Sequence, residues 1–158
     1  MESNRNPIRL LLHVPVPWVF VLVYLVGFAL EREWPLHVVE RVPYLDFAGG
    51  FVLGVGAAIA GWGLVTFWKA KTTTVPGKTS SQMVTWGPYR FTRNPMYVGL
   101  TIAYLGEALL LRQLWPVVLL PLVIAYVHWI VIPLEESKIQ EAFGDQYEQY
   151  RARVGRWI

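Results

Sequence analysis

The sequence predicts an all-α protein, a membrane bundle of four transmembrane helices with a cytoplasmic C-terminal amphipathic helix. Of the 158 residues, 54% are hydrophobic and only 16% are charged, whereas a soluble domain carries about 25% charged residues. Long uncharged stretches recur along the chain, and the basic residues collect in the segments between them. This much apolar surface excludes intrinsic disorder, and the length suits a single domain over residues 1–158.

Four apolar stretches define the predicted spans, because a helix needs roughly 20 apolar residues to cross a bilayer core. They cover residues 10–30, 47–68, 96–111 and 114–134. The first reaches the required length by starting near Leu10, and the third is short and contains one charged residue, Glu107. The tight connection Arg112–Trp115 predicts that the last two spans form a helical hairpin, in which Pro116 opens the returning helix.

The basic residues predict the orientation of the bundle. Of the 14 Lys and Arg residues, all but Arg32, Arg41 and Arg112 lie in segments on the side of the N-terminus. The positive-inside rule therefore predicts that both termini and the loop 69–95 are cytoplasmic. No small-residue cleavage site follows the first apolar stretch, so we expect no cleaved signal peptide.

Small residues recur at helical spacing in the second span. Gly50, Gly54, Ala57 and Gly61 fall on one face of the predicted helix. Small side chains let two helix backbones approach closely in lipid. We therefore interpret this stripe as a helix-packing face.

The loop before the third span ends in a helix-start signal. Asn94 suits the N-cap position, and Pro95 suits the first helical position. The third span then begins near the cytoplasmic surface with free backbone N–H groups, which favour a carboxylate or another anion. The alternative is that the pair only caps the helix.

Two adjacent carboxylates, Glu135 and Glu136, end the uncharged fourth span. An acidic pair is unfavourable at a helix C-terminus, so we expect a cationic partner. The candidates are Arg93 and a ligand that carries an ammonium or a sulfonium. The alternative is a charge pair that marks the membrane boundary.

Two further ionisable residues fall inside predicted spans. His128 precedes Glu135 by seven residues, which places it on the same helical face about 10 Å inside the interface. Such a residue is a candidate for function by default, and a hydrogen-bonded structural histidine is an equal alternative. Glu107 lies deeper, either as a structural carboxyl or lining a cavity.

The residue pattern of the tail, residues 135–158, predicts an amphipathic helix from Ser137 to Ile158. Ile139, Phe143, Tyr147 and Tyr150 recur at intervals of three and four residues. We expect this helix to lie over the cytoplasmic mouth of the bundle or to anchor at the interface.

Four motifs in this order resemble the integral-membrane methyltransferases, which include the isoprenylcysteine carboxyl methyltransferases and the phospholipid N-methyltransferases. The motifs are Val84-Thr85-Trp86-Gly87-Pro88-Tyr89, Arg93-Asn94-Pro95-Met96-Tyr97-Val98-Gly99, Glu135-Glu136 and Phe143-Gly144-Asp145-Gln146-Tyr147-Glu148-Gln149-Tyr150. The resemblance covers residues 47–157 and implies S-adenosylmethionine as the methyl donor, bound at the cytoplasmic ends of the last two spans.

The resemblance also implies which residues contact this cofactor. They are Ser81, Gln82, Met83, Val84, Tyr89, Asn94, Pro95, Met96, Tyr97 and Glu135. The phospholipid branch further implicates Glu136. With His128 and Arg93, Glu136 completes our set of catalytic candidates. No metal site is expected, because methyl displacement needs none and no metal-ligand spacing occurs.

Two departures decide between the branches. Asn94 stands where the isoprenylcysteine enzymes have His, and Val131 stands where they have a substrate-contacting Arg. We therefore expect a phospholipid-type amine as acceptor, with Glu136 or His128 removing its proton, and carboxyl methylation of an isoprenylcysteine as the alternative. A reading from another class is a small four-helix transporter that uses Glu107. The expected partners are a lipophilic substrate and the bilayer, without nucleic acid or an obligatory protein partner.

Overall fold

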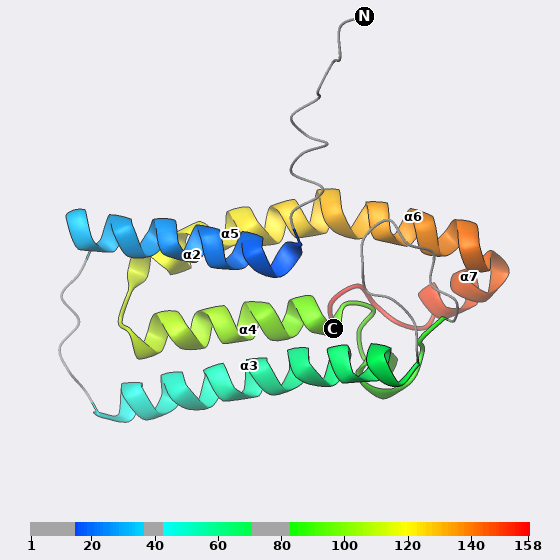
Figure 1. Ribbon diagram of the computed structural model, residues 1–158, viewed down its shortest axis with the longest axis horizontal. Helices are drawn as coiled ribbons and strands as arrows, with labels where there is room; N and C mark the ends of the chain where they lie inside the picture. The colour runs from blue at the N-terminus through cyan, green and yellow to red at the C-terminus, as the bar shows by residue number, and fades with distance from the viewer. Residues whose placement is uncertain (1–14, 37–42, 71–82) are drawn as a thin grey trace, which may run out of the picture.

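The computed structural model describes residues 15–36, 43–70 and 83–158 (Figure 1). Every regular element in these ranges is a helix, which confirms the all-α class. In chain order they are α2 (Val16–Glu33), α3 (Pro43–Lys69), the 3-10 turn η1 (Gly87–Arg90), α4 (Pro95–Leu110), α5 (Leu114–Tyr126), the π-helical turn η2 (Val127–Val131), α6 (Ile132–Phe143) and α7 (Asp145–Arg151).

The long helices lie where the apolar stretches predict them, with shifted ends. α2 begins directly after Pro15, and the predicted start near Leu10 lies outside the described residues. α3 begins at Pro43, four residues before the predicted span, and α4 matches its prediction within one residue at each end. The α4–α5 hairpin forms as predicted.

Two of the helices are long and apolar enough to cross a membrane. They are α3 and the continuous helix Leu114–Phe143, whereas α4 is apolar but shorter. Large apolar side chains point outward from these and the neighbouring helices, and Leu22, Leu25 and Leu122 are each more than half exposed. An apolar surface of this extent is typical of a membrane-facing protein. The count of four spans and the cytoplasmic termini remain predictions.

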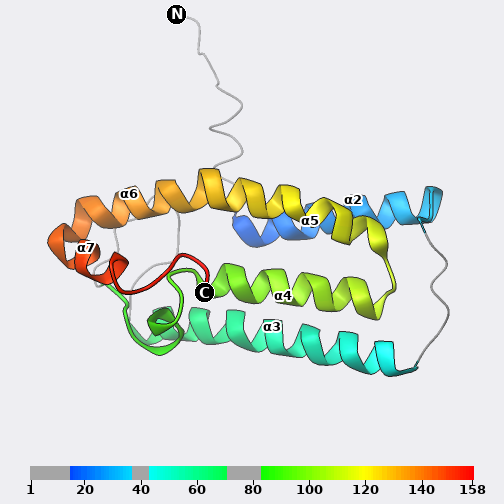
Figure 2. The same cartoon turned by 180° about the vertical axis from the view of Figure 1, so that it is seen from behind.

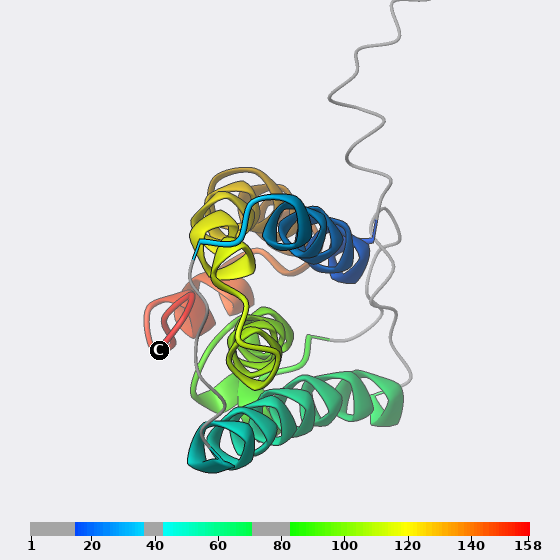
Figure 3. The ribbon, with the colours of Figure 1, turned by 90° about the vertical axis from the view of Figure 1, so that its left-hand side faces the viewer.

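The helices pack in three levels. Figures 2 and 3 show α2 beside α5, with α4 next to this pair and α3 outermost. Aromatic rings fill the space between α2 and α4, where the Tyr24 and Tyr104 rings meet edge-to-face at 5.0 Å. The Tyr104 hydroxyl donates to the carbonyl of Pro116, 3.0 Å away, which joins α4 to α5.

Glycine allows α3 and α4 to pack antiparallel at close range. Gly49, Gly56 and Gly63 are the buried glycines of α3, and they recur every seven residues. A side chain at Gly56 would overlap the backbone of Ala103 on α4. The predicted packing stripe is therefore wrong in its face. A Cβ at Gly50 or Gly54 would meet nothing within 4 Å.

The fourth predicted span continues past residue 134. The helix runs from Leu114 to Phe143, and its turn η2 is π-helical. Pro133, the second residue of α6, has no N–H to donate to the carbonyl of Trp129, so the regular α-helical hydrogen bonding is already interrupted there. A π-turn is wider than an α-turn. Seven residues from His128 to Glu135 therefore no longer make two turns.

The predicted tail helix is broken at Gly144. This residue adopts φ +50°, a left-handed conformation that glycine reaches without strain. α7 follows and ends at Arg151, and residues 152–158 then turn back toward the bundle as a non-helical segment, the C-terminal strap. Tyr147 and Tyr150 are buried as the predicted apolar face requires, but on α7 rather than on one long helix.

The opposite end of the molecule holds the α4–α5 turn and is called the hairpin end. Glu31 on α2 accepts hydrogen bonds from the backbone N–H groups of Leu114 and Trp115, both at 2.8 Å. A carboxylate is favourable at this N-terminus of α5. Arg112 in the turn pairs with Asp46 of α3.

Candidate functional site

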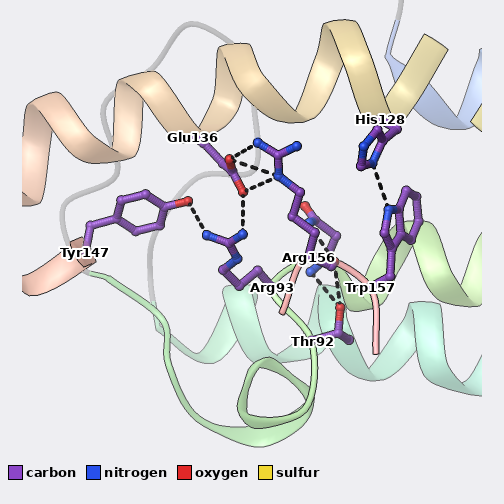
Figure 4. Close-up of polar contacts among 8 residues, drawn as sticks. Thr92, Arg93, His128, Glu136, Tyr147, Arg156 and Trp157 are labelled. Atoms are coloured by element: carbon purple, nitrogen blue, oxygen red, sulfur yellow. Dashed lines mark hydrogen bonds and ion pairs between the residues drawn. The ribbon is translucent and has the colours of Figure 1, made fainter. Parts of the chain in front are cut away.

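Polar side chains gather where α4 begins and where α6 leaves the bundle, which we call the strap end (Figure 4). Four segments meet there: the loop 91–94, the helix from η2 into α6, α7 and the C-terminal strap. The loop and the strap are more than 50 residues apart in the chain. The contacts at this end are therefore tertiary rather than local.

Glu135 faces the first turn of α4. The hydroxyl of Tyr97 donates to its Oε1 at 2.7 Å. Tyr97 is buried, with 8% of its surface exposed. This hydrogen bond joins two of the predicted cofactor residues, which lie 38 positions apart in the sequence.

Glu136 points instead to two guanidinium groups. Arg93 pairs with its Oε1 at 3.2 Å, and Arg156 donates to its Oε2 at 2.7 Å through a terminal nitrogen. The side chains of Arg93 and Glu136 are only 10% and 12% exposed. The predicted cationic partner of the acidic pair is thus present, but it binds the second carboxylate and acts together with Arg156.

Tyr147 of α7 adds a phenol to this ion-pair cluster. Its hydroxyl accepts a hydrogen bond from Arg93 at 3.2 Å. Burial, followed by the charge of Glu136, raises the pKa of Tyr147 to about 12, so it stays neutral. The hydrogen bond to Glu136 raises the pKa of Arg156, which keeps the guanidinium charged.

Tyr89 contributes a buried hydroxyl without a partner. Its side chain is 5% exposed, and within the described ranges its hydroxyl makes no hydrogen bond. The ring is fixed against Phe67 at 5.1 Å, and its carbonyl accepts a hydrogen bond from Tyr150 at 2.7 Å. Burial raises the pKa of Tyr89, with smaller contributions from Tyr150 and Glu135. A buried hydroxyl without a hydrogen-bond partner is costly and calls for an explanation.

Asn94 is the N-cap residue of α4, and Pro95 is the first helical residue, as predicted. The Asn94 side chain does not cap the helix. Its amide donates instead to the carbonyl of Arg156 at 2.9 Å. Thr92 donates to the same carbonyl at 2.9 Å, and its hydroxyl also accepts from the backbone N–H of Asn94.

His128 takes a partner other than Glu135. Its Nδ1 accepts a hydrogen bond from the indole N–H of Trp157 at 3.0 Å, and the two rings are stacked with centroids 6.2 Å apart. His128 and Glu135, which the sequence placed on one helical face, therefore have different partners in the structure. The wider turn η2 accounts for the difference.

The remaining predicted site residues divide into three groups. Met83 and Val84 precede η1, where Val84 is buried and Met83 is partly buried, and Pro95 and Met96 open α4. Ser81 and Gln82 lie outside the described residues. Glu107 is in the last turn of α4, near the hairpin end, and takes part in none of the contacts described above for the strap end. In the parts of the chain that are described, no three His, Cys, Asp or Glu side chains are placed to hold a metal ion.

Sequence reasoning missed two residues of this end, Arg156 and Trp157. Both belong to the segment that we expected to form an amphipathic helix over the cytoplasmic mouth of the bundle or at the interface. Periodicity could not have identified them, because the strap has no regular secondary structure and its partners are 20 to 64 residues away.

Comparison with known proteins shows the family of the chain. The chain is 40% identical over 72 residues to the Protein-S-isoprenylcysteine O-methyltransferase of Schizosaccharomyces pombe, a match that covers 46% of this chain and 30% of that protein. The chain therefore matches less than a third of the length of this relative. Residues 45–146, from the start of α3 to the start of α7, match the model of the phospholipid methyltransferase family. The chain belongs to the phospholipid methyltransferase family.

Proposed function

We propose that the protein transfers a methyl group from S-adenosylmethionine to a lipophilic acceptor at the cytoplasmic membrane interface, and that the preferred acceptor is a phospholipid-type amine. One observation carries the proposal. The Tyr97–Glu135 pair and the unpaired buried hydroxyl of Tyr89 belong to the same end of the bundle as the N-terminus of α4. Family membership supports the reaction class.

The chemistry of these residues fits the cofactor. S-adenosylmethionine carries a carboxylate, an ammonium and a sulfonium. The N-terminus of α4 favours the carboxylate, because the helix dipole is positive there. Glu135 can receive the ammonium, and the Tyr89 hydroxyl can pair with a polar atom of the bound molecule. Met83, Val84 and Met96 provide apolar surface, and Tyr97 fixes the Glu135 carboxylate.

When bound, S-adenosylmethionine would supply a methyl group on a sulfonium. A neutral acceptor amine, having lost its proton to water at the interface, would take the methyl group with its lone pair as the S–C bond breaks and sulfur keeps the electron pair. The residues of the chain do not bond to the methyl group. Their work is to align the two reactants and to exclude water. Tyr97 contributes to this alignment by holding the Glu135 carboxylate in one orientation.

The geometry changes the roles that we assign to the catalytic candidates. Glu136 pairs with two guanidinium groups, Arg93 through Oε1 and Arg156 through Oε2, so both of its oxygens are engaged. We therefore assign Glu136 and Arg93 to positioning. His128 uses its Nδ1 to accept from Trp157, so this nitrogen is not available as a base.

The acceptor assignment rests on the cations near the site. Val131, the position that resembles a substrate-binding Arg in the isoprenylcysteine enzymes, is only 8% exposed and packs in the apolar core. Arg93 and Arg156 are both bound to Glu136. An acceptor carboxylate would be costly to bury without a cation. A neutral amine acceptor needs no cation.

A second candidate acceptor is an isoprenylcysteine carboxylate. The relative in Schizosaccharomyces pombe bears the name of an enzyme for that substrate and matches 46% of this chain. In this alternative Arg93 or Arg156 would have to leave Glu136 and pair with the substrate.

A side-by-side assay tests the acceptor. The purified protein receives radiolabelled S-adenosylmethionine with phosphatidylethanolamine or with a farnesylcysteine analogue at equal concentration. We expect faster labelling of the phospholipid. Faster formation of a base-labile methyl ester on farnesylcysteine would reverse the assignment.

The cytoplasmic placement of the site has its own test. A reporter fused after Ile158 should be active only on the cytoplasmic side, where S-adenosylmethionine is available. Activity on the opposite side would place the strap end away from the cofactor pool and would overturn the proposed orientation.

A further inference from the structure

The C-terminal strap runs between the loop 91–94 and the helix from η2 into α6 (Figure 4). Two backbone carbonyls of the strap accept hydrogen bonds from the loop. The N–H of Arg93 donates to the carbonyl of Gly155 at 2.8 Å. The carbonyl of Arg156 accepts from the side chains of Thr92 and Asn94, both at 2.9 Å. Three consecutive loop residues are thus tied to two consecutive strap residues.

The side chain of Arg156 ties the strap to α6. Its Nε and a terminal nitrogen both donate to the carboxylate of Glu136, at 3.2 and 2.7 Å. A forked contact of this kind fixes the orientation of a carboxylate as well as its charge. One residue therefore holds Asn94 through its carbonyl and Glu136 through its guanidinium.

Trp157 ties the strap to η2 and fixes the state of His128. An indole N–H is only a donor, so the Nδ1 that it contacts must be an acceptor. In the neutral imidazole the proton then resides on Nε2. Trp157 therefore makes the other nitrogen of His128 a hydrogen-bond donor.

We propose that the C-terminal strap is a positioning element of the active site, in which Arg156 orients Asn94 and Glu136 and Trp157 sets the tautomer of His128. The inference rests on the proposed methyl transfer and extends it to residues outside the segment that matches the family model, which ends at residue 146. Arg156 and Trp157 act through other residues and do not touch the reacting atoms.

Arg156 is tested by Arg156→Ala and Arg156→Lys, with Arg153→Ala as the matched control. Arg153 lies in the same strap, but its side chain is exposed and, among the residues that the structure describes, hydrogen-bonds only to the carbonyl of Gln149. Rates are normalised to the number of sites that bind S-adenosylhomocysteine. Because misplaced groups cost rate steeply, we expect kcat to fall about tenfold or more in Arg156→Ala and to recover partly in Arg156→Lys. Arg153→Ala should match the wild type.

A purely structural clamp gives a different result. It lowers the fraction of binding-competent protein, while the kcat per site and the KM for the acceptor stay at the wild-type values. That outcome in Arg156→Ala would overturn the positioning role.

Trp157 is tested by Trp157→Phe, which keeps the stacked ring and removes the N–H, with Ile158→Ala as the control. The nitrogen-15 NMR signals of His128, recorded in a background where His13 and His37 are replaced by Gln, report its tautomer. We expect the Nε2–H form in the wild type and in Ile158→Ala, and a mixture in Trp157→Phe. An unchanged spectrum in Trp157→Phe would overturn the inference for Trp157.

The two levels of the proposal fail separately. Lack of S-adenosylhomocysteine binding by the wild-type protein would refute the proposed function. Binding and turnover by the wild type, together with unchanged kcat per site in Arg156→Ala, would refute the role of the strap alone.

Discussion

Glu31 at the hairpin end and the acidic pair Glu135-Glu136 at the strap end are held by different kinds of partner. At the hairpin end, one carboxylate oxygen of Glu31 accepts hydrogen bonds from the two backbone N–H groups at the start of α5. At the strap end, Glu135 and Glu136 are held by side chains alone, a phenol and two guanidinium groups. The first arrangement satisfies groups that every helix leaves unpaired. In the second arrangement, the two carboxylates contact no backbone group among the described residues.

This difference supports the proposal that the strap end binds the ligand. Backbone capping is complete once the helix is formed, and the other carboxylate described at the hairpin end, Asp46, is 40% exposed in its pair with Arg112. The Nε of Arg112 is also unpaired among the described residues. The strap end instead buries charged groups, which is costly, and leaves the Tyr89 hydroxyl unpaired among the described residues. Buried charge and an unpaired buried hydroxyl are features that binding of a polar molecule explains.

The largest effect is expected from Glu136→Gln. The substitution removes the charge that balances the buried Arg93, and loss of one partner from a buried ion pair costs about 3 kcal/mol or more. The free energy of unfolding, measured in detergent micelles, should fall by that amount. Glu141→Gln on the exposed side of α6 is the control and should change it by less than about 0.5 kcal/mol. Equal stability of the two variants would show that the strap end is not an energetically coupled cluster.

A middle-sized effect is expected from Gly56→Ala, halfway between the two ends. The added methyl group would overlap the backbone of Ala103, and overpacking costs about 1–3 kcal/mol. Gly54→Ala adds the same methyl group where nothing lies within 4 Å and should be neutral or slightly stabilising. Thermal unfolding of both variants checks the expectation. A loss of stability in Gly54→Ala as large as in Gly56→Ala would contradict the assigned packing face.

The smallest effect is expected from Glu31→Gln at the hairpin end. A capping carboxylate contributes about 1 kcal/mol to a helix, and a neutral amide oxygen retains part of this. Stability should therefore fall by less than about 1 kcal/mol, with exposed Glu33→Gln as the control. Affinity for S-adenosylhomocysteine should stay within a factor of about two. A large loss of affinity for S-adenosylhomocysteine would contradict the assignment of different functions to the two ends.

The sequence predicted the helices well, because helix existence depends on the length of an apolar run. It predicted the packing face of α3 poorly. Glycines occur around much of this helix, and only the position of α4 shows that Gly56 rather than Gly54 is at the contact. Such a choice depends on the partner surface and has no local signal.

The candidate site was predictable residue by residue but not in its connections. Glu135 and Glu136 were identified as an acidic pair with one cationic partner. On a helix, adjacent side chains diverge by about 100°, so the two carboxylates enter different networks, one with Tyr97 and one with Arg93. The contacts of the strap could not be predicted, because they depend on the interruption of the helix at Gly144, where the chain changes direction.

The most direct test of the account is a calorimetric titration of the purified protein with S-adenosylhomocysteine. We expect the wild type and Glu31→Gln to bind alike. Glu135→Gln should bind more weakly by about 1.5–3 kcal/mol, the value of a hydrogen bond to a charged group, while its unfolding transition remains cooperative. Wild-type protein that does not bind, or Glu135→Gln that folds and binds with unchanged affinity, would contradict the assignment of the strap end as the cofactor site.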